Sequence, residues 1–137
     1  MNNPNKHIRK YFFDTLNNVS VSGQEIPCFD SRQATENHNI CFLMLDQNND
    51  RQKESKCNLA TTQNLTIEVI ERVQRFGNTG SRVLLDDATE LVYNAFDNIN
   101  INGFFISEKS LNDQSVATYD QSEILNRNII TLTFKIE

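Results

Sequence analysis

Three cysteines and two histidines are the side chains in this sequence best suited to nucleophilic or metal chemistry. They are Cys28, Cys41, Cys57, His7 and His38. The cysteines are odd in number and widely spaced, and none forms the C-x-x-C pair that zinc and redox sites use. A catalytic thiol needs a nearby histidine or a helix N-terminus, but side chains at the positions of His38 and Cys41 need not meet. We therefore expect reduced, structural cysteines.

The acidic residues and glycines do not supply a catalytic set either. Asp86 and Asp87 are adjacent on an expected helix, where neighbouring carboxylates diverge and face water, and Asp113 is remote in sequence. Gly77-x-x-Gly80 is too short for a phosphate-binding loop, and no lysine follows it. No nucleophile, base and orienting group can be assembled from the sequence. We therefore predict a protein that is not an enzyme and that holds no metal ion or cofactor.

The chain of 137 residues is long enough for one domain, which we expect to span residues 1–137, and its net charge is −5. Its scattered Lys and Arg residues do not form the basic face that a nucleic-acid partner needs. There is no apolar run of membrane-spanning length and no signal-peptide core, so we expect no membrane partner and synthesis in the cytoplasm. The 19 asparagines are interspersed with periodic apolar residues, which favours a folded chain over prion-like disorder.

Apolar spacing predicts the elements of the first half of the chain. An i, i+4, i+8 pattern predicts a helix over residues 4–18. Ser22-Gly23 predicts a tight turn between short strands within residues 19–29. Residues 39–45 are apolar on both faces and predict a buried central strand. Residues 46–58 are polar, charged and without a period, which predicts a long excursion from the sheet.

The second half predicts one more helix and several strands. Residues 59–76 alternate as a long strand, and Ser81 is a plausible N-cap for a helix that runs to residues 94–97. Shorter strands are expected over residues 99–107, 115–119 and 128–137. The fold class is therefore α+β: an antiparallel, twisted sheet packed by two helices, in the order α-β-β-β-β-α-β-β. We expect its inward-facing residues to be uniformly apolar.

Several segments also carry a family resemblance. The run from Val21 to Asp30, VSGQEIPCFD, is similar to a family start of the form V-x-G-x-x-V-P-V-Y-D. Residues 39–45 are similar to the strand P-Y-I-V-L, and the long strand to L-x-I-x-V-x-T. With the later helix and closing strands, nearly the whole chain resembles the tail-terminator and tail-completion proteins of tailed bacteriophages, also called minor tail or head–tail joining proteins. Cys28 departs from the common Val, and residues 46–58 are more charged than the family pattern.

This resemblance implies a structural virion protein that assembles into a homo-oligomeric ring. The ring would be a hexamer in long-tailed phages or a dodecamer matched to the portal in short-tailed relatives. It would sit at the head–tail junction or tail end, with portal, connector and tail proteins as partners, and DNA would pass through without specific binding. The asparagine bias suits an AT-rich phage genome.

Polarity and length indicate residues 46–58 and the 107–123 connection as regions of subunit contact. The candidate contact residues are Asp50, Arg51, Lys53, Glu54, Lys56, Lys109 and Asp113. Two other functions stay open. A small ligand-binding or enzymatic α+β domain would place convergent polar groups inside the sheet. A host-directed accessory protein would be monomeric and missing from virions.

Overall fold

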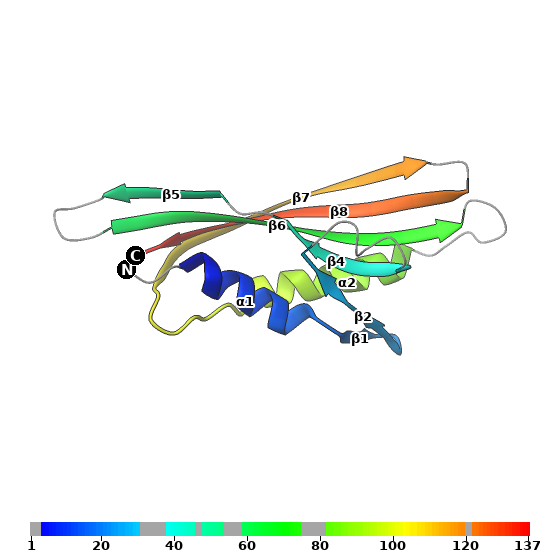
Figure 1. The fold of residues 1–137 in the computed structure, drawn as a ribbon, viewed down its shortest axis with the longest axis horizontal. Coiled ribbons are helices and arrows are strands. Elements are labelled where there is room, and N and C mark those ends of the chain that lie inside the picture. Colours follow the sequence, from blue (N-terminus) through cyan, green and yellow to red (C-terminus); the bar gives the residue numbers. More distant parts are fainter. Residues whose placement is uncertain (1–3, 31–37, 46–47, 54–58, 75–81, 120–121) are drawn as a thin grey trace.

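A computed structural model describes residues 4–30, 38–45, 48–53, 59–74, 82–119 and 122–137, with the backbone alone for residues 5, 48–53, 59, 60 and 74. Its fold is mixed α+β, with two helices on one face of a mostly antiparallel sheet (Figure 1). The observed order is α-β-β-β-β-β-β-α-β-β, which adds two strands to the predicted order. No helix in these ranges is both long and apolar enough to cross a membrane.

Helix α1, Pro4–Leu16, begins at the predicted residue and ends two residues before the predicted end at residue 18. Proline suits a first helical turn because its missing N–H would have no partner there. Ile8, Phe12 and Leu16 are completely buried, as their common face requires. The helix ends because Asn18 adopts a left-handed conformation with φ of 59°, which asparagine tolerates better than most residues.

The predicted hairpin is confirmed as β1, Val19–Val21, and β2, Gln24–Ile26. Ser22 and Gly23 have φ values of 52° and 82°, and two central residues with positive φ define a type I′ turn. The turn sets the register that pairs Val19 with Ile26, whose side chain is buried in the main core.

The main sheet has the strand order β3-β4-β6-β8-β7, with β5 paired to β6. Its strands are β3 (Cys28–Phe29), β4 (Ile40–Met44), β5 (Asn48–Lys53), β6 (Leu59–Gln74), β7 (Ile106–Tyr119) and β8 (Glu123–Ile136). All pairs are antiparallel except β3 with β4. On one side β6 pairs with β8, and on the other its first half pairs with β5 and its second half with β4. The predicted buried strand at residues 39–45 is confirmed as β4.

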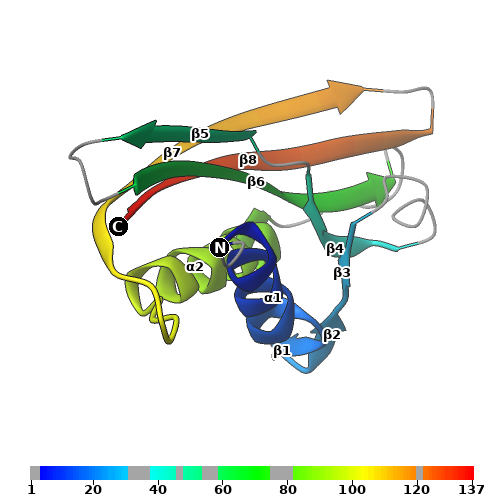
Figure 2. The same cartoon turned by 60° about the vertical axis from the view of Figure 1, so that its left-hand side comes forward.

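Helices α1 and α2 (Arg82–Asp97) lie side by side on one face of this sheet, called here the helix face (Figure 2). The opposite side is called the outer face. Three aromatic rings form the centre of the core, because the ring centroid of Phe134 lies 6.1 Å from that of Phe12 and 5.6 Å from that of Phe96. These residues come from β8, α1 and α2, so one cluster joins both helices to the sheet.

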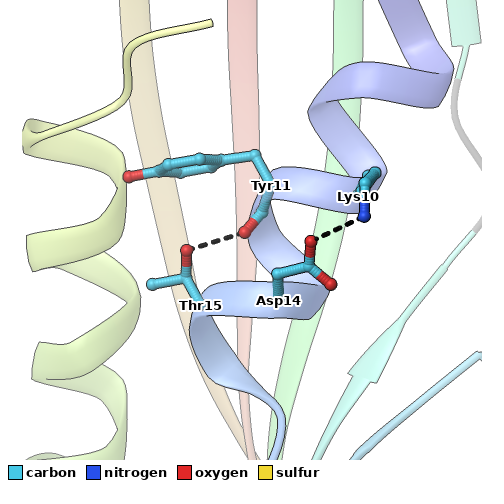
Figure 3. A network of polar contacts seen from close by, with 4 residues as sticks. All are labelled: Lys10, Tyr11, Asp14 and Thr15. Carbon is cyan, nitrogen blue, oxygen red and sulfur yellow. Dashed lines mark hydrogen bonds and ion pairs between the residues drawn. The ribbon is translucent and has the colours of Figure 1, made fainter.

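Polar contacts fix how α1 sits on its neighbours. The Tyr11 hydroxyl donates to the carbonyl of Ala95 on α2 at 2.7 Å, and Figure 3 shows this side chain reaching across to the second helix. Arg9 donates to the carbonyl of Leu45, just after β4, at 3.0 Å. The neighbouring Lys10–Asp14 ion pair, also drawn in Figure 3, is largely exposed, so it contributes little to stability.

Two predicted segments take a different structure. Within the predicted excursion at 46–58, residues 48–53 form strand β5, and the remaining residues lie outside the described ranges. A strand at a sheet edge is held by main-chain bonds to one neighbour, so it needs no apolar period to form. Residues 99–105 are not a strand, because Ile101, Asn102, Gly103 and Phe104 make a type II turn with Gly103 at φ of 87°.

The end of the chain is also more extended than its sequence indicates. Strand β7 is continuous over Ile106–Tyr119, so the predicted short strand at 115–119 and most of the predicted 107–123 connection belong to it. Strand β8 starts at Glu123 rather than at residue 128. Neither stretch has a clean apolar alternation that would have predicted a strand. Strand β7 is largely exposed, and residues 123–127 of β8 are only partly buried. The Gly77-x-x-Gly80 segment and the predicted Ser81 cap lie outside the described ranges.

The expectation of a uniformly apolar inner surface is wrong. Gln63, Glu71 and Asn128 are buried polar residues at helix-face positions of β6 and β8. Gln63 and Glu71 are an even number of positions from the core residues Leu65, Ile67 and Val69 along β6, and Asn128 is two positions from Ile130 along β8. This spacing places them on the same face as the core. The helix face is therefore apolar in its centre and polar toward both ends.

Candidate interaction surface

Cys28 and Cys41 have the structural role that their sequence context predicts. Cys28 and Cys41 are free, buried and packed in separate clusters on opposite faces of the sheet. Burial raises the pKa of Cys28 to about 12 and that of Cys41 to about 11, so both thiols stay protonated and unreactive at neutral pH. His38 packs its ring 4.8 Å from that of Phe29. Cys57 lies outside the described residues, among which no His, Cys, Asp or Glu group could hold a metal ion.

Lys109 and Asp113, two of the predicted contact residues, lie on β7 and bind α2 of their own chain. Lys109 Nζ donates to the carbonyls of Phe96 and Asp97, each at 2.9 Å, and lies 5.0 Å from the centroid of the Phe96 ring. A cation is favourable there because the last carbonyls of a helix carry partial negative charge. Asp113 accepts a hydrogen bond from the Tyr93 hydroxyl. These two residues attach the helix to the sheet edge.

The other predicted contact residues are distant from this attachment. Asp50, Arg51 and Lys53 are in β5, on the opposite edge of the sheet from β7. Glu54 and Lys56 lie outside the described residues. The seven predicted residues therefore do not form one cluster. Those that the structure describes fall on two different edges of one sheet.

A groove of about 490 Å³ runs between α2 and β7. It is lined by Asp86, Thr89, Glu90, Tyr93, Asp113, Ser115 and Asn128. Its floor is a chain of hydrogen bonds: Ser115 Oγ donates to Asn128 Oδ1 at 2.7 Å, and Asn128 Nδ2 donates to Thr89 Oγ1 at 2.8 Å. Because each buried group in this chain has a partner, the floor is rigid and its polar groups are satisfied.

The walls of the groove are acidic. Three lining residues carry carboxyl groups and none carries a cation. Burial, followed by the hydrogen bond to Asp113, raises the pKa of Tyr93 to about 12. Its hydroxyl therefore keeps its proton at neutral pH and continues to donate to the carboxylate. The groove presents a fixed negative surface directly beside the edge of the sheet.

The free edge of β7 follows from the hydrogen-bond pattern. The Glu137 amide donates to the Phe105 carbonyl at 2.9 Å, so odd-numbered residues of β8 direct their main-chain groups toward β7. With the observed register, the even-numbered residues of β7 from Glu108 onward bond to β8. The main-chain groups that point outward belong to Lys109, Leu111, Asp113, Ser115, Ala117 and Tyr119. No other described strand pairs with β7.

This edge has few of the features that keep strands from associating. Natural sheet edges are protected by lysines, prolines, bulges or short length. Residues 110–119 contain no Lys, Arg or Pro, and the one register shift in β7 lies at its beginning, between Ile106 and Glu108. In contrast, the edge strand β3 has two residues and follows Pro27. The edge of β7 is therefore long, regularly paired after its bulge, and without these protective features over residues 110–119.

The sequence did not reveal this surface, because the weak apolar pattern of residues 107–114 divided one strand into a connection and a short strand. The useful signal was the absence of Lys, Arg and Pro over ten consecutive residues. Comparison with known proteins does not add a family: no protein-family model and no curated protein matches this chain.

Proposed function

We propose that this protein is a structural virion subunit, which assembles into a ring at the head–tail junction or tail end of a tailed phage and joins the portal or connector to the tail. The observation that carries the assembly role is the unprotected edge of β7. A soluble domain that leaves such an edge open is prone to pair with another strand, so a strand from another subunit is its natural cover. The phage context rests on the pattern resemblance of the sequence.

A ring is the form of assembly that the edges of this sheet favour. Its two long outer borders, β7 and the β5 side of β6, differ in length and sequence. A contact between two different patches is heterologous, and heterologous contacts repeat from copy to copy until rotation closes a ring. Two identical edges would instead give a closed dimer. The number of copies is proposed as six or twelve.

The charges on the outer face are compatible with a position near DNA but do not favour DNA binding. Arg127 is paired with Glu68 at 2.9 Å and Arg72 with Glu123 at 3.1 Å. These cations are neutralised by carboxylates, and the α2–β7 groove is acidic. With a net charge of −5, a ring of such subunits would not grip a passing phosphate backbone.

Native mass spectrometry of the purified protein tests the assembly, and imaging of virions tests its place. We expect a species of six or twelve copies of the 15.8 kDa chain, and density or immunogold label at the junction between head and tail. A protein that stays monomeric at every concentration and is absent from purified particles contradicts the proposal. That result would instead support a host-directed accessory role.

A second candidate, ligand binding by a monomer, is favoured by one observation. Buried Asn128 and Thr89, hydrogen-bonded to each other and to the exposed Ser115, give the groove a preformed polar floor, which binding pockets commonly have. If this candidate is right, the original protein is a monomer that binds a ligand, and the Asn128→Leu variant loses that binding. A ring species in the native mass spectrum would argue against this candidate.

A further inference from the structure

The second free edge of the sheet is β5. The Leu45 amide donates to the Thr66 carbonyl at 2.8 Å, so even-numbered residues of β6 direct their main-chain groups toward β4 and β5. The register pairs residues 48, 50 and 52 of β5 with even-numbered residues of β6. The outward main-chain groups of β5 therefore belong to Asn49, Arg51 and Lys53. No further described strand covers them.

The two edges are complementary in charge. Strand β5 contains two cations, Arg51 and Lys53, and one anion, Asp50. The β7 edge lies beside the carboxyl groups of the α2–β7 groove, and its residues 110–119 contain no cation. Pairing β7 with β7 would bring two acidic grooves together, and pairing β5 with β5 would bring like cations together. Both arrangements cost electrostatic free energy, whereas β5 against β7 gains it.

The two edges differ in length, but their lengths are compatible. Six residues of β5 extend about 20 Å, and the outward-facing stretch of β7 from Lys109 to Tyr119 extends about 35 Å at the usual rise per residue. The shorter edge therefore fits entirely on the longer one. Arg51 and Lys53 would then lie along the side of the sheet that carries Asp86 and Glu90 on the neighbouring α2.

We propose that β5 of one copy adds to the β7 edge of the next, so that the sheet continues from subunit to subunit with the Arg51–Lys53 segment beside the acidic α2–β7 groove. This contact rests on the proposed assembly role and specifies its partner as a second copy of the same chain. It is heterologous, which leaves one free β5 and one free β7 on any open oligomer.

Proline at residue 117 tests the β7 half of the contact. Ala117 is exposed and its amide points outward, so Ala117→Pro removes an edge donor without removing a bond to β8. Ala117→Val is the matched control because it keeps the amide. We expect at least a tenfold weaker association of the proline variant by native mass spectrometry or light scattering, with a circular dichroism spectrum like that of the control. Equal assembly of the two variants would overturn the proposal.

Charge reversal tests the β5 half and does not depend on whether the proline variant folds. We expect Arg51→Glu with Lys53→Glu to weaken assembly by at least tenfold. Adding Asp86→Lys and Glu90→Lys to the same chain should restore assembly in part. The β5 edge is then negative and the α2–β7 groove more positive, so the two surfaces attract again. Assembly that is insensitive to the reversal at residues 51 and 53 would show that β5 is not the partner strand.

A mixing experiment separates this contact from other arrangements. The Ala117→Pro variant keeps an intact β5 edge, and the variant with Arg51→Glu and Lys53→Glu keeps an intact β7 edge. Their mixture should therefore form one contact, which gives a heterodimer, and no ring because the two remaining edges are both impaired. A β7–β7 contact would instead leave the charge-reversed variant fully assembled and the mixture without a heterodimer. If the unchanged protein forms rings that all these variants also form, the strand contact is wrong while the assembly role stands. If the unchanged protein never assembles, both are wrong.

Discussion

The two faces of strand β6 are stabilised in different ways. On the helix face, Leu65, Ile67 and Val69 are fully buried beneath α1 and α2. On the outer face, charged and hydroxyl groups bond across to β8: Arg127 reaches Glu68, and Thr133 Oγ1 donates to Asn64 Oδ1 at 2.8 Å. Apolar burial provides most of the free energy of folding, whereas directional polar pairs fix the register of neighbouring strands. The outer face also buries Ile70 in a small apolar cluster, so β6 is stabilised mainly by burial on one side and by burial together with polar pairing on the other.

The largest effect is expected on the helix face. Phe134→Ala removes the ring between Phe12 and Phe96 and should lower the free energy of unfolding by about 3–5 kcal/mol. Phe13→Ala on the exposed side of α1 is the matched control, with an expected loss of about 1 kcal/mol. Chemical denaturation of both variants measures the difference. Similar losses at the two positions would show that the three-ring cluster is not the centre of the core.

A smaller effect is expected from the outer face. Glu68 is 1% exposed, so Arg127→Met removes the ion pair of a buried carboxylate and should cost about 2–3 kcal/mol. Arg72→Met is the matched change, at an ion pair whose Glu123 is 39% exposed, and should cost about 1 kcal/mol or less. Urea midpoints of the two variants provide the test. Equal midpoints would mean that burial does not distinguish the two pairs.

The smallest effect on the free energy of unfolding is expected at Glu71, at one polar end of the helix face, and this effect depends on pH. Glu71 is 6% exposed, and within the described residues its Oε1 atom has no hydrogen-bond partner. Burial raises the pKa of this carboxyl, although a hydrogen bond from Asn126 and the charge of Arg82 oppose the shift. The folded protein therefore binds this proton more tightly than the unfolded chain does. The Glu71 contribution to stability consequently falls as the pH rises from 4.5 through the raised pKa.

Glu71→Gln should remove this dependence. We expect the variant to be more stable than the unchanged protein at neutral pH by about 1 kcal/mol, with the advantage shrinking as the pH falls toward 4.5. Glu25→Gln, at an exposed position of β2, is the control and should change stability by about 0.5 kcal/mol or less. Thermal unfolding across the acidic range measures both. An advantage that grows as the pH falls would contradict the assigned cause.

The sequence predicted elements whose side chains have a strong period or a distinctive turn. Helix α1, the Ser22-Gly23 hairpin and buried β4 were all recognisable because their residues face a core or require a special conformation. Strands β5 and the first half of β7 were not, because main-chain bonds to one neighbour hold an edge strand whatever its side chains are. The same cause concealed the candidate site. Arg51 and Asp113 were identified as polar, but only the sheet order shows that they mark opposite edges.

The position of β8 has a consequence for when this fold can form. Strand β8 lies between β6 and β7 in the sheet but follows both in the chain, so Thr61 pairs with Ile136 across more than half of the sequence. Pairings between such distant residues form slowly and after local ones. A nascent chain on the ribosome cannot close its sheet until Ile136 has emerged. Strand β7 therefore joins the sheet only after residues 123–136 have been synthesised, because β8 is the one described strand that pairs with it.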